Sequence, residues 1–173
     1  MSFSLRKAGP GEADALSLIG AATFLETFAG VLDGAAVVAH CRAAHAPAFY
    51  AACLARPDAA AALAEVAPGG APVGYTLLGA PDLPVPDPQP TDAELKRLYV
   101  LSRYHGAGVG AALLERAFGT ARAQGRTRVL LGVYAGNARA RHFYARYGFA
   151  QVAERQFRVG PRAYDDVVLA RDV

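Results

Sequence analysis

The sequence has no tryptophan, one methionine and only two cysteines, Cys41 and Cys53. The two thiols lie in an alanine-rich segment at a spacing that fits neither a disulfide framework nor a zinc site, which suits a reducing compartment. No run of 18 apolar residues occurs without glycine or proline, so no membrane-spanning helix is expected. Glu12 and Asp14 interrupt the start of the chain, which argues against a secretory signal. These absences predict a cytoplasmic protein that does not enter a membrane.

Charge is also sparse, since Asp, Glu, Lys and Arg make up 19% of the residues and the net charge is +3. The basic residues are scattered rather than gathered in a run, which argues against a nucleic-acid partner. His40, Cys41 and His45 do not share one helical face, so no metal site is expected. The 173 residues, 53% of them hydrophobic, predict one globular domain over residues 1–173. A homodimer remains open.

Apolar periodicity and turn residues divide the chain into helices and strands. A helical stretch over 34–55 is expected to break at Pro47, and the five prolines of 79–92 predict a loop. Asn137 is the predicted N-cap of a helix. The full prediction is strand 3–7, helix 12–28, helices either side of Pro47, a hairpin of strands 60–66 and 73–78, strand 94–101, helix 109–124, strand 127–134, helix 137–147, and a hairpin of strands 151–159 and 163–170. This order predicts an α+β fold.

The most informative segment is the turn between the strand 94–101 and the helix 109–124. Gly106, Gly108 and Gly110 alternate there, which allows a tight backbone turn and close approach of an anion. The free N–H groups of the helix start and the helix dipole favour a phosphate at this point. Arg103 adds a cationic fork. A plain strand-to-helix turn with a surface arginine remains an alternative.

Three cofactor classes compete for such a turn. A nucleotide-binding Walker loop needs Gly-Lys-Ser/Thr, which is absent. A dinucleotide site needs an acidic residue at the end of the next strand, where the sequence reads Val133-Tyr134-Ala135. The pyrophosphate of coenzyme A is the third candidate.

Arg103-x-x-Gly106-x-Gly108-x-Gly110, preceded by Leu98-Tyr99-Val100, resembles the acyl-CoA motif of the GCN5-related N-acetyltransferase (GNAT) superfamily. The stretch Asn137-x-x-Ala140-x-x-Phe143-Tyr144-x-x-x-Gly148-Phe149 is similar to the next signature of that family. The resemblance implies a mixed, mostly antiparallel sheet with a splayed parallel strand pair and flanking helices.

The resemblance also implies a set of cofactor-binding residues for acetyl-CoA. Pantetheine would lie between the splayed strands, and the pyrophosphate would lie in the glycine turn. Arg139 and Arg141 are further candidates for the remaining phosphate. The implied cofactor-binding set is Leu98, Tyr99, Val100, Arg103, His105, Gly106, Ala107, Gly108, Val109, Gly110, Asn137 and Tyr144.

Two side chains are assigned catalytic roles by the same resemblance. Tyr144 matches the tyrosine that gives a proton to the departing thiolate. Deprotonating an alkylammonium at pH 7 costs about 4.6 kcal/mol, so a base is needed. Glu94 is the first candidate base because it begins the central strand and is expected to share a face with Leu98 and Val100. Glu26 and Asp33 are weaker candidates.

The implied activity is transfer of an acetyl group from acetyl-CoA to a primary amine, by direct attack in a ternary complex. The acceptor would be a small molecule, polyamine-like, or a peptide amine. Gly132 stands where the ribosomal-protein branch of the family has a glutamate, which argues against that branch's mechanism. The alternative is a non-catalytic acyl-CoA-binding sensor or interaction module. The acidic residues that favour a cationic acceptor are Asp82, Asp87, Asp92, Glu94, Asp165 and Asp166.

Overall fold

The computed structural model describes residues 2–173 of the chain. Helices and strands alternate along it much as the sequence predicts. In chain order they are β1 (Ser4–Ala8), η1 (Pro10–Glu12), α1 (Ala13–Phe28), α2 (Gly34–Ala44), α3 (Pro47–Leu54), β2 (Ala60–Val66), β3 (Ala71–Gly79), β4 (Asp92–Val100), η2 (Ser102–Tyr104), α4 (Val109–Ala123), β5 (Arg128–Tyr134), α5 (Ala138–Arg146), β6 (Ala150–Val159) and β7 (Arg162–Asp172). Across residues 2–173, no helix is long and apolar enough to cross a membrane.

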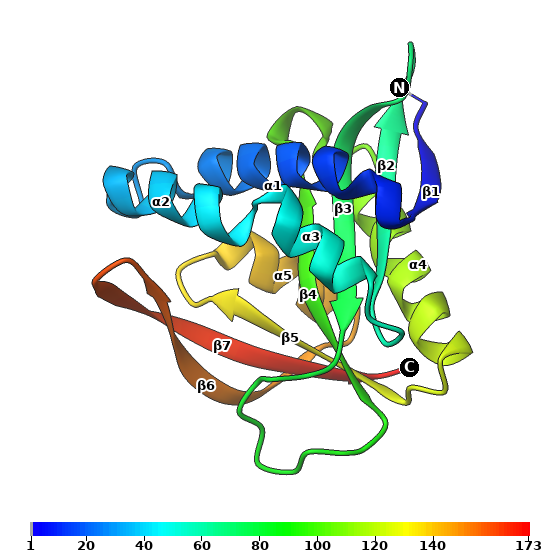
Figure 1. Cartoon of the computed structure of the whole chain (residues 1–173). Helices are drawn as coiled ribbons and strands as arrows, with labels where there is room; N and C mark the ends of the chain where they lie inside the picture. Colours follow the sequence, from blue (N-terminus) through cyan, green and yellow to red (C-terminus); the bar gives the residue numbers. More distant parts are fainter. Residues whose placement is uncertain (1) are drawn as a thin grey trace.

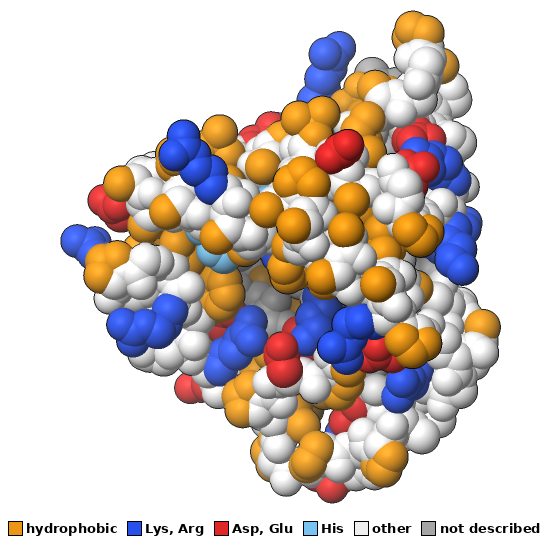
Figure 2. All heavy atoms as spheres, in the orientation of Figure 1, with side chains coloured by type: hydrophobic (Ala, Val, Ile, Leu, Met, Phe, Trp, Pro, Cys, Tyr) orange, Lys and Arg blue, Asp and Glu red, His pale blue; other side chains and the backbone are white. Residues whose placement is uncertain are grey.

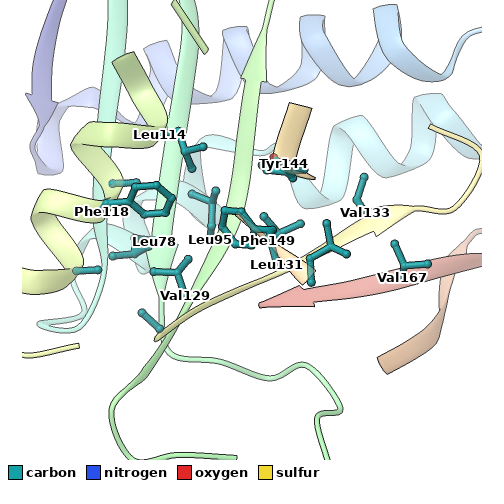
Figure 3. Close-up of a cluster of buried hydrophobic side chains, with 14 residues drawn as sticks. Leu78, Leu95, Leu114, Phe118, Val129, Leu131, Val133, Tyr144, Phe149 and Val167 are labelled. Atoms are coloured by element: carbon teal, nitrogen blue, oxygen red, sulfur yellow. The ribbon is translucent and has the colours of Figure 1, made fainter. Parts of the chain in front are cut away.

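The strands form one sheet in the order β1-β2-β3-β4-β5-β7-β6. Its neighbouring strands run antiparallel except for β4 and β5, which α4 connects as a crossover helix. In Figure 1, α1, α2 and α3 cross one face of the sheet, and α4 runs along another side. The buried side chains of α4 and α5 pack against apolar residues of β3, β4, β5 and β7 (Figure 3). The expected α+β fold with one parallel strand pair is confirmed.

Helix ends lie where capping residues predict them. The Asn137 side chain accepts a hydrogen bond from the Ala140 N–H at 3.0 Å, which confirms it as the N-cap of α5. Pro47 is the first residue of α3, so the helical stretch breaks there as expected. Gly125 has a φ of +70° just beyond α4, a conformation that only glycine adopts without strain.

The parallel pair β4–β5 is short. Its paired residues run from Asp92 with Arg128 to Glu94 with Leu130, and beyond them the two strands are no longer hydrogen-bonded. In Figure 1, β4 and β5 diverge toward α5. The strand β4 begins two residues earlier than predicted, because buried Asp92 forms a two-pronged ion pair with Arg128 at 2.7 and 2.8 Å.

A β-bulge in β4 corrects one sequence prediction. Leu95 pairs with Leu78 and Arg97 pairs with Leu77, so Lys96 is an extra residue in the strand. The bulge changes which side chains share a face, because the residues after it are shifted by one position. Glu94 therefore does not share a face with Leu98 and Val100. It faces the side covered by α1–α3.

On that side, a buried polar network fastens the α2–α3 corner to β4. The Arg97 guanidinium donates to the Tyr50 hydroxyl at 2.6 Å, to His45 Nδ1 at 3.2 Å and to the Ala44 carbonyl at 2.7 Å. Tyr50 in turn bonds to the buried Tyr75 at 3.1 Å. Because Arg97 can only donate, Nδ1 of His45 must accept, and the imidazole is neutral.

The neutral imidazole makes the stability of the fold depend on pH. Burial first, and then the charge of Arg97, lowers the pKa of His45 to about 3. Between about pH 6.5 and pH 3 the unfolded chain therefore binds more protons than the folded chain, and stability falls as pH falls. We expect His45 to reduce the free energy of unfolding by about 2 kcal/mol between pH 7 and pH 5.

Urea unfolding of the wild type and of His45→Gln at the two pH values measures this contribution. The variant should lose less stability on acidification than the wild type. An equal loss in both proteins would exclude His45 as the source. Glu94 and Asp166, whose pKa values burial raises, act in the opposite direction and are common to both proteins.

Candidate active site

The glycine turn forms an open cradle of backbone N–H groups. Gly106 and Gly108 have φ values of +82° and +84°, which only glycine adopts without strain. The first helical bond of α4 runs from the Ala112 N–H to the Gly108 carbonyl, and the N–H groups of 108–111 make no backbone bond. These donors and the positive end of the helix dipole lie together where the sequence predicts an anion site.

Side chains around the turn hold its shape. The His105 ring donates through Nε2 to the Val100 carbonyl at 2.7 Å, and this bond holds the ring against the end of β4. Glu26 of α1 accepts from the Ser102 N–H and hydroxyl at 2.8 and 2.7 Å. These bonds lower the pKa of Glu26, which makes it a poorer proton acceptor than the sequence suggests. Arg103 is exposed and has no ion-pair partner within residues 2–173.

The end of β4 presents free backbone groups to the gap between β4 and β5. The Leu101 N–H donates to the Val73 carbonyl at 2.9 Å, so alternate residues of β4, including Tyr99, turn their backbone groups toward β3. The N–H and C=O groups of Leu98 and Val100 therefore point toward β5, where pairing has ended. Of the three residues predicted to offer backbone contacts, the register favours Leu98 and Val100.

Tyr144 lies between the diverging strands (Figure 3). Its side chain is 7% exposed, and its ring packs against Phe143 and Phe149. The hydroxyl has no hydrogen bond within residues 2–173. Every fully buried side-chain polar atom in these residues does have a partner, so the Tyr144 hydroxyl is not fully buried and reaches open space. Burial first, and then nearby Tyr99, raises the pKa of Tyr144 well above that of a free phenol. The hydroxyl stays protonated at neutral pH and can donate.

Two further aromatic residues near Tyr144 pack in the core. Phe143 and Tyr147 lie against the main hydrophobic cluster. Arg139 and Arg141 are exposed on this helix.

Glu94 is 5% exposed at the start of β4. Its Oε2 atom accepts from the Asp82 N–H at 2.9 Å and from Lys96 Nζ at 2.8 Å. Burial raises the pKa of Glu94, and the bond from Lys96 partly offsets the rise. The carboxylate is thus a stronger base than an exposed glutamate, although Lys96 holds one of its oxygens. Asp33, the weaker candidate, caps α2 through the Ala36 N–H at 2.9 Å.

A hollow opens on the face of the sheet that carries Glu94. Figure 2 shows it between the helical layer above and the loop 79–92 below, with basic and acidic side chains around it. Leu83 of the loop packs with Leu130 and Val168, so the loop closes the lower end of this face. The hollow lies opposite the side from which Tyr144 approaches the gap.

Sequence reasoning missed an ion pair on the same face of the sheet as Glu94. Arg155 Nη2 lies 3.3 Å from Asp166 Oδ2, across the hairpin of β6 and β7. A Cβ atom added to Gly132 would lie 2.7 Å from Arg155 Nη2, so the guanidinium fills the space above this glycine. The sequence signal that could have revealed this pair is Asp166, which directly precedes the apolar run 167–170 and pairs with Arg155 in the predicted hairpin.

The acidic residues that favoured a cationic acceptor are largely paired with basic ones. Lys96 bridges Asp82 at 2.9 Å and Glu94 at 2.8 Å. Asp92 is paired with Arg128 at the far end of β4. The hollow therefore carries positive and negative side chains together, rather than an uncompensated acidic surface.

Comparison with known proteins agrees with this geometry. The model of the acetyltransferase (GNAT) family matches residues 25–149. An uncharacterized N-acetyltransferase of Mycobacterium tuberculosis (strain ATCC 25618 / H37Rv) is 41% identical over 101 residues, which are 58% of this chain and 60% of that protein. An uncharacterized N-acetyltransferase of Lactobacillus delbrueckii subsp. lactis is 28% identical over 102 residues, 59% of each chain. The chain thus spans about 60% of the length of these relatives.

Solved structures share the fold at low sequence identity. A PaiA N-acetyltransferase from Thermoplasma acidophilum, crystallised in complex with coenzyme A, superposes with a TM-score of 0.78 at 20% identity over 100% of both chains. The ribosomal-protein-S18-alanine N-acetyltransferase from Escherichia coli gives a TM-score of 0.66 at 17% identity, over 99% of this chain and 94% of that one. Since the family model covers most of the chain and the fold agrees throughout, the chain belongs to the acetyltransferase (GNAT) family.

Proposed function

We propose that the protein transfers an acetyl group from acetyl-CoA to a primary amine, by direct attack in a ternary complex. The observation that carries the proposal is the alignment of two features along one gap. The free N–H groups of the glycine turn fit a pyrophosphate, and the gap beyond the turn contains the Tyr144 hydroxyl, which has no hydrogen-bond partner among residues 2–173. The structure of the Thermoplasma acidophilum relative with coenzyme A supports this cofactor.

In this proposal the cofactor-binding residues act in order along the gap. The turn 105–110 and Arg103 hold the pyrophosphate, and the free groups of Leu98 and Val100 hold pantetheine, with Tyr99 and Asn137 beside it. A backbone N–H of β4 polarises the thioester carbonyl. The amine nitrogen forms a bond to the carbonyl carbon, the C–S bond breaks, and Tyr144 gives its proton to the thiolate.

Glu94 takes the proton of the attacking ammonium through water. The raised pKa of Glu94 brings it closer to the pKa of the amine, which makes the transfer less unfavourable. We expect Glu94→Gln to lower kcat by about 100-fold at pH 7, within the range of general-base effects. A pH–rate profile should also lose its acid limb, because activity of the wild type falls as Glu94 becomes protonated.

Thermal unfolding separates loss of the base from disruption of the loop 79–92, whose Asp82 N–H donates to Glu94. Glu94→Gln keeps the acceptor oxygen for the Asp82 N–H, so its thermal unfolding midpoint should stay near that of the wild type. An acid limb that persists unchanged in the variant would assign the base to another residue.

Thiol release from acetyl-CoA over a panel of primary amines tests the function as a whole. Acetyl-CoA should bind, and at least one amine should accelerate thiol release. Binding without turnover on any amine would favour the alternative, a non-catalytic acyl-CoA sensor. Binding of NADH in place of acetyl-CoA would contradict both.

A further inference from the structure

The Arg155–Asp166 pair in the hollow is incompletely hydrogen-bonded. Both contacts to Asp166 Oδ2 are 3.3 Å long, against about 2.7–2.9 Å for a good charge-assisted bond. Asp166 Oδ1 and Arg155 Nη1 have no partner within residues 2–173. Every fully buried side-chain polar atom in these residues has a hydrogen-bond partner, so these two atoms are not fully buried and reach solvent. The pair therefore keeps one free acceptor on Asp166 and one free donor on Arg155, at the edge of the guanidinium that faces away from Asp166.

The pair lies close to the proposed reaction centre. The Arg155 guanidinium sits over Gly132, two residues beyond the last β4–β5 pair at Leu130. Asp166 pairs with Tyr134, the last residue of β5, so it lies on the strand next to the point where β5 has separated from β4. A ligand held by the pair would thus lie beside the gap where the thioester is proposed.

Aromatic side chains lie near the pair on β5, β6 and β7. The Arg155 guanidinium lies 5.6 Å from the centroid of the Phe157 ring. Tyr134 contacts both Tyr164 and Phe28, with ring centroids 6.4 Å apart in each case. These four side chains are half-buried, and three of them, Phe28, Phe157 and Tyr164, also pack against a neighbouring hydrophobic cluster. They suit an apolar or aromatic group.

We propose that the acceptor is an α-amino acid with an apolar or aromatic side chain, bound through its carboxylate to Arg155 and through its amine to Asp166. This identification rests on the proposed N-acetyltransferase function. The amine and carboxylate of an α-amino acid are joined by one carbon atom, so they can reach two protein side chains that are themselves in contact. A zwitterion also leaves the balanced charge of the hollow unchanged. A polyamine would bring several cations to carboxylates that Lys96 and Arg155 already neutralise.

Three acceptors of defined chemistry test the proposal: L-phenylalanine, L-phenylalaninamide and spermidine. The amide has the same shape as the amino acid but no carboxylate. The wild type should prefer L-phenylalanine over its amide by about 30-fold in kcat/KM, as expected for one charged hydrogen-bonded contact. Arg155→Gln should bring this ratio close to one, mainly through a higher KM for L-phenylalanine.

Arg158→Gln is the matched control, because Arg158 lies on the same strand but is exposed, and within residues 2–173 its side chain hydrogen-bonds only to the Pro161 carbonyl. It should keep the wild-type ratio. Arg155→Lys, which keeps the charge but not the fork, should give an intermediate ratio and guards against a misfolded Gln variant. Thermal unfolding checks that each variant is folded.

The outcomes separate the two proposals. Equal or better use of the amide, an equal loss on both substrates in Arg155→Gln, or a preference for spermidine would overturn the amino-acid acceptor and leave the N-acetyltransferase function intact. Acetyl-CoA binding without transfer to L-phenylalanine would also overturn it. Failure to bind acetyl-CoA at all would overturn the proposed function itself.

Discussion

Replacing Tyr144 by phenylalanine should lower kcat by about 100-fold or more, the range of a lost general acid. The thiolate would then leave without a proton from the protein. Binding of acetyl-CoA should be unchanged, because the ring stays in place against Phe143 and Phe149. Stability should change little as well, since the hydroxyl has no hydrogen-bond partner within residues 2–173. Steady-state kinetics with calorimetric titration of acetyl-CoA measures both quantities.

Tyr147→Phe is the matched control, because it removes a tyrosine hydroxyl at the C-cap of the same helix, from a side chain that packs against the same hydrophobic cluster. Its kcat should stay within a few-fold of the wild-type value. A full-activity Tyr144→Phe enzyme would show that solvent protonates the thiolate. A variant that fails to bind acetyl-CoA would instead give Tyr144 a binding role.

Replacing Gly20 by alanine should destabilise the protein by about 3 kcal/mol, from overpacking and broken hydrogen bonds together. Gly20 lies in α1 directly against the network that fastens the α2–α3 corner to β4. An added Cβ would overlap the Tyr50 hydroxyl and lie 2.5 Å from His45 Nδ1. Neither atom can withdraw without losing its bond to Arg97.

Gly119→Ala provides the comparison for this effect. Gly119 lies inside α4, and a Cβ there would meet nothing within 4 Å. Alanine is the better helix former, so this change should stabilise the protein by about 0.5–1 kcal/mol. Urea unfolding of both variants gives the two free energies. If Gly20→Ala proves as stable as the wild type, then the helical layer tolerates displacement and the network is not rigid.

The Gly20 contact illustrates a class of feature that local patterns do not reveal. From the sequence, a glycine inside an alanine-rich helix predicts only a lower helix propensity. In the structure, Gly20 is the position where the side chains of Tyr50 and His45 approach the α1 backbone. Those residues are 30 and 25 positions away in the chain. Arg97 is one of four charged residues in β4, so the sequence of the strand does not single it out as the residue that Tyr50 and His45 cover.

The bulge at Lys96 shows the same limit within a single element. Period-two alternation placed Glu94 with Leu98 and Val100, yet one extra residue moved Glu94 to the opposite face. The bulge in β4 depends on how β4 pairs with β3, and the sequence of β4 alone does not determine that pairing. The same holds for Arg155 and Asp166, which meet only because β6 and β7 pair in one register.

The sequence alone determined the features that depend on neighbouring residues. The helix boundaries at Pro47, Gly125 and Asn137 follow from backbone conformation and capping, and the glycine turn follows from φ values that only Gly106 and Gly108 adopt without strain. Tertiary structure decided what lies around the proposed acceptor site, because Glu94, Arg155 and Asp166 come from three strands that are distant in the chain. The proposed donor site consists mainly of residues that are close together in the sequence, so the sequence could suggest it. The proposed acceptor site depends on long-range packing, so the sequence could not suggest it.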